Sequence, residues 1–183
     1  MRGGPATRLA PAGAPEPAAE LAVVVGCHGL LCTFPVSFVD RLLRRDEVEV
    51  LTPQPRKVRA AILPQVVLAA DEPFVAWNLG SMLDLPPVVA AWVLLHVPHG
   101  GGEPLPIALR TGPCLMVAPA PALTVLPPGL FRMRGRGIAG AFSTEALRGK
   151  GLGQAVGIAF DPGRLWSAAE LDSRRAALAE IEE

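Results

Sequence analysis

The chain has 183 residues, half of them hydrophobic, and its 17 basic and 17 acidic residues give a formal net charge of zero. This balance argues against nucleic acid or an anionic membrane as a partner, because each needs a positive field over one face. No segment reaches the roughly 18 uninterrupted apolar residues of a membrane span, and the start lacks the apolar run of a signal peptide. Three cysteines cannot all pair within one chain, so we expect reduced thiols in a cytoplasmic protein.

The first half of the chain is predicted to begin with a tail and continue as short strands. Residues 1–20 are Pro, Ala and Gly with few large apolar groups, which is typical of a flexible segment. Val36, Val39, Leu42 and Leu43 recur at helical spacing and predict a short amphipathic helix. Glycines and prolines spread along the sequence favour strands around it. The strands expected in this half are residues 21–26, 30–35, 47–51, 65–69 and 73–77.

A turn at Ala70 and Asp71 joins the last two of those strands, and Asn78 stands where a helix N-cap belongs. A hairpin follows around the glycine loop at 100–102. Residues 118–128 are expected to form an edge broken by prolines. The remaining expected elements are strands 91–97, 105–109, 114–117, 137–142 and 154–160, and a closing helix over 164–183.

One plan occurs twice in the sequence. Residues 74–83 and 156–165 each read as a buried strand, an Asn or Asp cap, and a leucine one turn later. The caps are Asn78 and Asp161. Repetition of this plan among many short strands predicts two similar small barrels.

Three segments carry a resemblance to a known family. Residues 32–48, 65–83 and 154–165 match, without gaps, the strands, Pro-Val corner, central hairpin and Asx-Leu caps of the CheW-like chemotaxis coupling proteins. The resemblance covers residues 21–171 and leaves 172–183 as the end of the C-terminal helix. It implies an all-β fold, mainly strands with short helices, in which two five-stranded SH3-like barrels pack around a shared hydrophobic centre.

The same resemblance implies a non-catalytic scaffold that couples chemoreceptors to a CheA-type histidine kinase, with no cofactor, metal or catalytic residue. Fold alone does not define function, so this step is analogy. Three departures favour a divergent adaptor with its own partner. The family's Asn-Leu-Arg-Gly turn is replaced by residues 68–71, its acidic position in the first helix is Arg41, and its Val-Asp segment appears as Arg110 and Thr111. The alternative is therefore a repurposed interaction module in a motility, polarity or regulatory complex.

The candidate partner-binding residues are apolar positions of the expected helix, positions where the family's pattern is replaced (Arg41, Ala70 and Asp71), and an arginine-rich segment. The apolar residues of the expected helix lie where the family has a groove for a partner's helix, although core packing explains them equally well. An arginine-rich segment is either a solvated loop or a contact for an acidic partner. The full set is Val36, Val39, Arg41, Leu42, Leu43, Ala70, Asp71, Arg132, Arg134 and Arg136.

Sharper chemical motifs receive less support. Residues 135–140 fit G-x-G-x-x-G but run into a strand, so a turn is expected instead of a phosphate loop. Cys27, His28, Cys32, His96 and His99 lack the paired spacing of a structural zinc site, and buried, inert cysteines are expected. An enzyme or ligand-binding barrel is the third hypothesis, and it requires a deep polar pocket with converging titratable groups.

Overall fold

The structure is a computed structural model that describes residues 20–51, 65–124, 137–144 and 156–182. The strands of these segments are β1 (Leu21–Cys27), β2 (Leu30–Pro35), β3 (Val39–Arg44), β4 (Glu49–Leu51), β5 (Val66–Ala69), β6 (Glu72–Asn78), β7 (Ala91–Val97), β8 (Leu105–Thr111), β9 (Cys114–Pro119), β10 (Ile138–Ser143) and β11 (Val156–Phe160). The helices are η1 (Val36–Phe38), η2 (Arg45–Glu47), α1 (Leu79–Met82), α2 (Pro162–Leu165) and α3 (Ala168–Glu182). No helix in these segments is long and apolar enough to cross a membrane.

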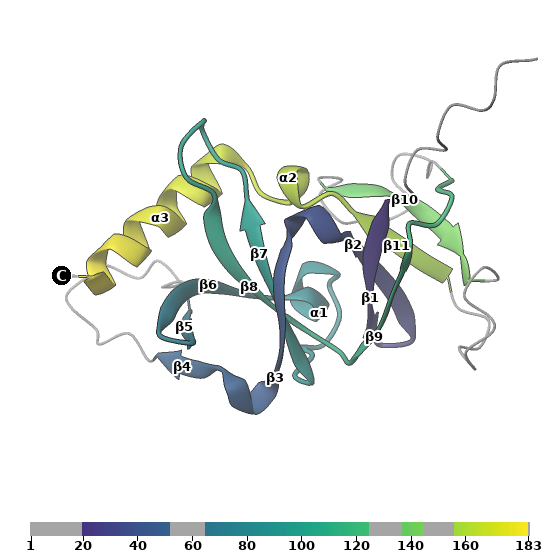
Figure 1. The fold of residues 1–183 in the computed structure, drawn as a ribbon, viewed down its shortest axis with the longest axis horizontal. Helices are drawn as coiled ribbons and strands as arrows, with labels where there is room; N and C mark the ends of the chain where they lie inside the picture. Colours follow the sequence, from purple (N-terminus) through teal and green to yellow (C-terminus); the bar gives the residue numbers. More distant parts are fainter. Residues whose placement is uncertain (1–19, 52–64, 125–136, 145–155, 183) are drawn as a thin grey trace, which may run out of the picture.

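The strands form two sheets, which we call the first and the second lobe (Figure 1). The first lobe has the order β10-β11-β2-β1-β9, and the second has the order β3-β7-β8-β6-β5-β4. The chain crosses between the lobes through η1 and again between β8 and β9. The all-β, two-lobed architecture expected from the sequence is confirmed, and the second lobe carries six strands where five were expected.

The second crossing is held close to β1 by a glycine. A Cβ on Gly112 would lie 2.2 Å from the carbonyl oxygen of Gly26, a distance that no side chain tolerates. Next to it, the backbone N–H of Gly26 donates to the carbonyl of Pro113 at 2.9 Å. Glycine is therefore required at position 112 to bring β8 and β9 against the end of β1.

A shared core lies between the lobes, and each lobe has a small core of its own. In β1, Val23 and Val25 belong to the central cluster, whereas Val24 belongs to the cluster of the first lobe. In β7, Leu95 belongs to the central cluster and Leu94 to that of the second lobe. Both faces of these strands are buried, which explains why their sequences read as continuous apolar runs.

The repeated cap positions behave as predicted. The Asn78 side chain accepts the N–H of Ser81 and of Val88, and its own amide donates to the Val88 carbonyl at 2.7 Å. The Asp161 carboxylate accepts the N–H of Gly163 at 3.0 Å. Each side chain satisfies helix N–H groups that have no partner within their helix.

The amphipathic helix expected at residues 36–43 is wrong. The segment is a 3₁₀ turn followed by β3, which pairs with β7. A β-bulge between Val39 and Arg41 inserts one residue, so Val39 and Leu42 fall on one face although they are three positions apart. The bulge therefore reproduces helical spacing within a strand.

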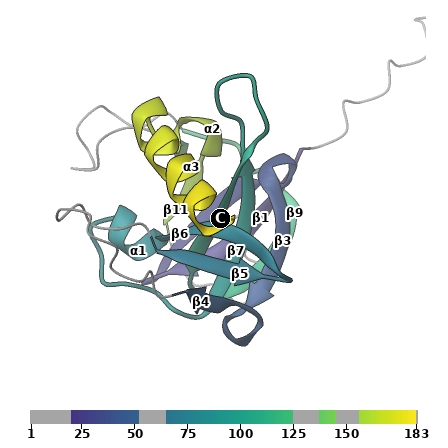
Figure 2. The same ribbon diagram turned by 90° about the vertical axis from the view of Figure 1, so that its left-hand side faces the viewer.

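The helix expected at 164–183 is two helices, because Trp166 and Ser167 interrupt it. Ser167 and Glu170 begin α3 with a capping box: the N–H of Ser167 donates to the Glu170 carboxylate at 2.8 Å, and the N–H of Glu170 donates to the Ser167 hydroxyl at 3.3 Å. Figure 2 shows α3 crossing the second lobe, where its Leu171 and Leu178 join the central cluster.

Candidate partner-binding surface

Exposed apolar side chains border the central core on both lobes. Leu42 on β3 is 37% exposed and lies opposite Val93, a member of the central cluster. On the first lobe, Val117 is 51% exposed and lies opposite Val23 of the same cluster. Directly opposite residues of antiparallel strands share a face, so both side chains extend the faces that cover the central core.

Two further residues complete this border. Val36, 36% exposed, lies in η1, which packs against β1, β3 and β7 at the crossing between lobes. Leu21 is 46% exposed and shares the β1 face of Val23, two positions away. We call Leu21, Val36, Leu42 and Val117 the interlobe margin.

The structure divides the apolar residues that the sequence groups together. Val36 and Leu42 belong to the margin, and Val39 is half-buried against the central cluster. Leu43 lies opposite Trp92 and packs on the core of the second lobe. Strand geometry sends neighbouring residues to opposite faces, which separates Leu43 from Leu42.

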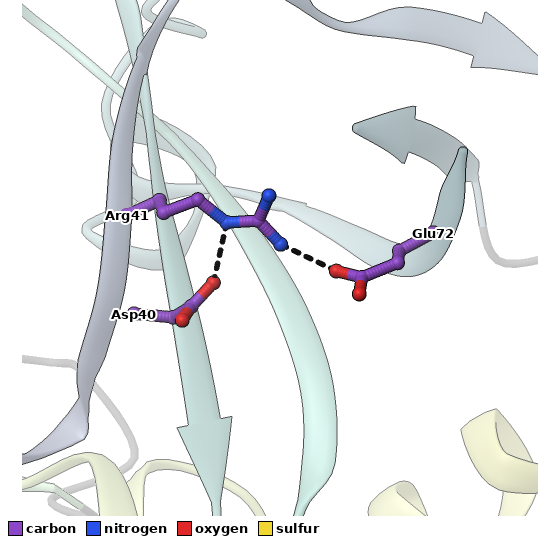
Figure 3. A network of polar contacts seen from close by, with 3 residues as sticks. All are labelled: Asp40, Arg41 and Glu72. Atoms are coloured by element: carbon purple, nitrogen blue, oxygen red, sulfur yellow. Dashed lines mark hydrogen bonds and ion pairs between the residues drawn. The ribbon is translucent and has the colours of Figure 1, made fainter. Parts of the chain in front are cut away.

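Arg41 lies on the other face of β3, in a charged network (Figure 3). Its Nε donates to the Asp40 carboxylate at 2.7 Å, and a terminal nitrogen donates to Glu72 at the start of β6. These hydrogen bonds, to Asp40 first and then Glu72, hold the pKa of Arg41 above its ordinary value. Two carboxylates thus surround one guanidinium, and the reversed charge at position 41 is matched within the chain.

The network borders a pocket of about 650 Å³ between the second lobe and α3. Its polar lining is Asp40, Arg41, Glu72, His96, Glu103 and Arg175, and its apolar lining includes Phe74, Leu105 and Leu178. This volume would suit a small molecule. The titratable side chains of this lining are of the kind that the enzyme or ligand-binding hypothesis requires. The described lining has no serine, threonine or cysteine that could act as a hydroxyl or thiol nucleophile.

The turn between β5 and β6 stands exposed beside this network. Ala70 and Asp71 both have positive φ, 51° and 65°, as a two-residue type I′ hairpin turn requires. The predicted turn is confirmed. Ala70 presents only a methyl group at the position where the resemblance places an arginine, and Glu72, the next residue after the turn, holds Arg41.

Two of the cysteines considered as metal ligands are buried, and two of the histidines pair within the chain. Cys27 and Cys32 are buried as predicted, and burial raises the pKa of both thiols; for Cys32, Cys27 raises it further. His28 Nε2 donates to the Pro86 carbonyl at 2.8 Å, and His99 pairs with Asp172 on α3 at 2.7 Å. Within the described segments, no three His, Cys, Asp or Glu residues are grouped as metal ligands.

The remaining sequence candidates are placed as follows. Gly137 has a φ of 80° and leads into β10, so the described end of the G-x-G-x-x-G segment is a turn before a strand and not the start of a helix. Arg132, Arg134 and Arg136 lie outside the described residues. Leu21 and Val117 were not predicted, because their place in the margin depends on strand register, which has no local signal.

The comparisons with known proteins agree with this architecture. The chain has the two-lobed β fold of CheW scaffolds. Its structure is similar to that of the scaffolding protein TtCheW from Thermoanaerobacter tengcongensis, with a TM-score of 0.56 and 11% sequence identity over 78% of this chain and 89% of that one. No family model matches the sequence, and no curated protein matches it. The similarity is therefore one of fold.

Proposed function

We propose that this chain is a non-catalytic adaptor that binds protein partners through the interlobe margin. The observation that carries the proposal is the exposure of Val36 in η1 and of Leu42 on β3, where Leu42 lies on the opposite face of the strand from Arg41. Apolar side chains exposed together at the border of a core are a common feature of protein-binding surfaces. Reduced cysteines and a balanced charge fit a cytoplasmic protein of this kind.

The partner we infer is a CheA-type histidine kinase together with a chemoreceptor. Two observations support this: the three ungapped segments that resemble CheW-like proteins, and the similarity in fold to the scaffolding protein TtCheW. In this proposal the margin receives an amphipathic helix of a partner, whose apolar side chains lie at helical spacing.

A specific observation favours the second candidate, a repurposed module in another complex. Arg41 is bound by Asp40 and Glu72, and the Ala70–Asp71 turn offers no arginine. If partners bind through these positions, the binding surface of this chain differs from that of the CheW-like family. The fold would then serve a motility, polarity or regulatory assembly.

Replacing Val36 with Asp tests the margin. A carboxylate there would have to be desolvated against a partner's apolar face, so we expect affinity for the kinase regulatory domain encoded in the same genome to fall at least about tenfold. Biolayer interferometry measures the change. Val50→Asp is the matched control, because Val50 is 39% exposed on β4, which pairs with β5 alone in the described sheet, and we expect it to bind as the original chain does.

Equal weakening by Val36→Asp and Val50→Asp would refute the margin as the binding surface. The partner itself is identified by co-purification from the native host with mass spectrometry. Recovery of kinase and receptor supports coupling, and recovery of a different defined complex supports the repurposed module. Failure to bind any kinase or receptor at tens of micromolar would exclude the coupling role while leaving the fold unaffected.

A further inference from the structure

An unusual arginine lies at the end of the second lobe's inner face. Arg110 on β8 is directly opposite Trp92 on β7, and its guanidinium carbon lies 4.7 Å from the centre of the Trp92 ring. Trp92 itself is 1% exposed and belongs to the core of the second lobe. The stack holds the planar guanidinium against a rigid support, which leaves its edge for hydrogen bonding.

The hydrogen-bonding capacity of this guanidinium is not used within the described chain. Its Nε is buried and has no hydrogen-bond partner. The ion pairs of the described residues join Arg41 to Asp40 and Glu72, and His99 to Asp172, and none involves Arg110. A buried donor without a partner is costly, and the guanidinium makes no hydrogen bond to the described residues, so its accessible donors are free for another group.

A second cation lies within range of this donor. Burial lowers the pKa of Arg110, and the charge of Arg45 lowers it further. Arg45 opens η2 immediately after β3, whose last residue, Arg44, pairs with Ala91 next to Trp92. Two guanidinium groups repel each other, and an anion between them would relieve the repulsion.

We propose that Arg110 and Arg45 form a binding site for a carboxylate presented by an acidic segment of a protein partner. The arginine fork matches a carboxylate with two parallel hydrogen bonds. The zero net charge of the chain lacks the broad positive field that nucleic acid needs, which favours an acidic peptide segment as the occupant. The site is separate from the interlobe margin, because Arg110 shares the face of Ala108 and Trp92 whereas Leu42 shares that of Val93.

The test follows the Nε–H resonance of Arg110 by ¹⁵N–¹H NMR in the full chain, assigned by its loss in Arg110→Lys. The protein is titrated with a capped hexaglutamate peptide and, in a separate experiment, with a capped hexaglutamine peptide of the same length. We expect a saturable shift with the acidic peptide only. Arg110→Met should weaken its binding about tenfold, since two charge-assisted hydrogen bonds are lost, and Arg45→Met about threefold, as for a more exposed charge.

Arg164→Met is the matched control, because Arg164 is an exposed arginine on α2, and it should leave binding unchanged. Equal binding by Arg110→Met and the original chain would overturn the proposal, as would an equal response to the glutamine peptide. A shift with inorganic phosphate but none with the acidic peptide would overturn the carboxylate assignment. If Arg110→Met fails to fold, an unchanged affinity in Arg45→Met and Arg110→Lys is the contradicting result.

Discussion

At the scale of single residues, Asn78 and Cys32 show two ways in which polar groups are accommodated in this chain: by local hydrogen bonds and by staying neutral. Asn78 shows the first case: one side chain fixes both the start of α1 and, through Val88, the loop that follows it. Cys32 shows the second, because its thiol is fully buried in the central cluster between the lobes. A thiolate at that position would lose its hydration without gaining a partner.

Cys32 therefore predicts a loss of stability at alkaline pH. Burial raises the pKa of its thiol in the folded chain, whereas the unfolded chain ionises it near the ordinary value of 9.0. Above that pH the unfolded state binds fewer protons, so the free energy of unfolding decreases as pH rises, by up to about 1.4 kcal/mol per pH unit. Urea denaturation between pH 8 and 10 measures the slope.

Cys32→Ala provides the comparison for this slope. It removes the buried thiol and should flatten the alkaline decrease, although its stability at pH 7 is lower because of the cavity it leaves. Cys114→Ala is the comparison at an exposed cysteine: burial raises its pKa as well, but less than that of Cys32, so its removal should reduce the slope less. An unchanged slope in Cys32→Ala would assign the alkaline loss to another group.

At the scale of elements, the β5–β6 hairpin carries a strain that a single substitution can relieve. Ala70 has a φ of 51°, a conformation that a residue with a Cβ adopts at a cost of about 1 kcal/mol. Ala70→Gly should raise the free energy of unfolding by about 0.5 kcal/mol, the relief being partly offset by the greater freedom of glycine in the unfolded chain.

Ala120→Gly is the control for the hairpin, because Ala120 is also exposed but does not have positive φ. At this position only the greater freedom of glycine in the unfolded chain acts, so we expect the free energy of unfolding to fall by about 0.5–1 kcal/mol. Thermal unfolding by circular dichroism compares the two variants. A decrease in both would show that the turn at Ala70 is not strained.

The elements also show why some of the fold is predictable from sequence and some is not. The N-caps at Asn78 and Asp161 and the turn at Ala70 depend on neighbours within a few residues, so local pattern is sufficient. The segment after Pro35 was misassigned because the bulge at Asp40 gives a strand the apolar spacing of a helix. Its pairing with β7 involves residues about fifty positions away, which no local window contains.

The candidate sites follow the same division. The sequence indicates Val36 and Leu42 as candidates because they are apolar and recur at helical spacing, but Val117 joins them only through the register of β1 with β9. The unpaired Nε of Arg110 could not be predicted from the sequence for the same reason, because the position of this guanidinium depends on the Trp92 ring on the neighbouring strand. Sequence pattern identifies candidates on one strand, and pairing decides which of them share a surface.

At the scale of the whole molecule, the lobes depend on each other. The central cluster takes Val23, Phe34 and Phe160 from the first lobe and Leu95 and Ile107 from the second. The Phe34 and Phe160 rings stack there with centroids 5.2 Å apart. Either lobe alone would expose one side of this cluster to water, so we expect the two lobes to unfold in one cooperative step.

Leu95→Ala tests that dependence across the lobe boundary. Leu95 is fully buried on β7, so the substitution should cost about 3 kcal/mol. Native-state hydrogen exchange should show the same loss of protection at Val24 in the first lobe as at Leu94 in the second, because a shared core transmits the loss to both. Leu68→Ala, at a half-buried position on β5, should lower the protection at Val24 and at Leu94 by a smaller amount, again equal at the two sites. Reduced protection at Leu94 with unchanged protection at Val24 would mean that the lobes fold independently, and the interlobe margin would then be a junction whose shape varies with the relative position of the lobes.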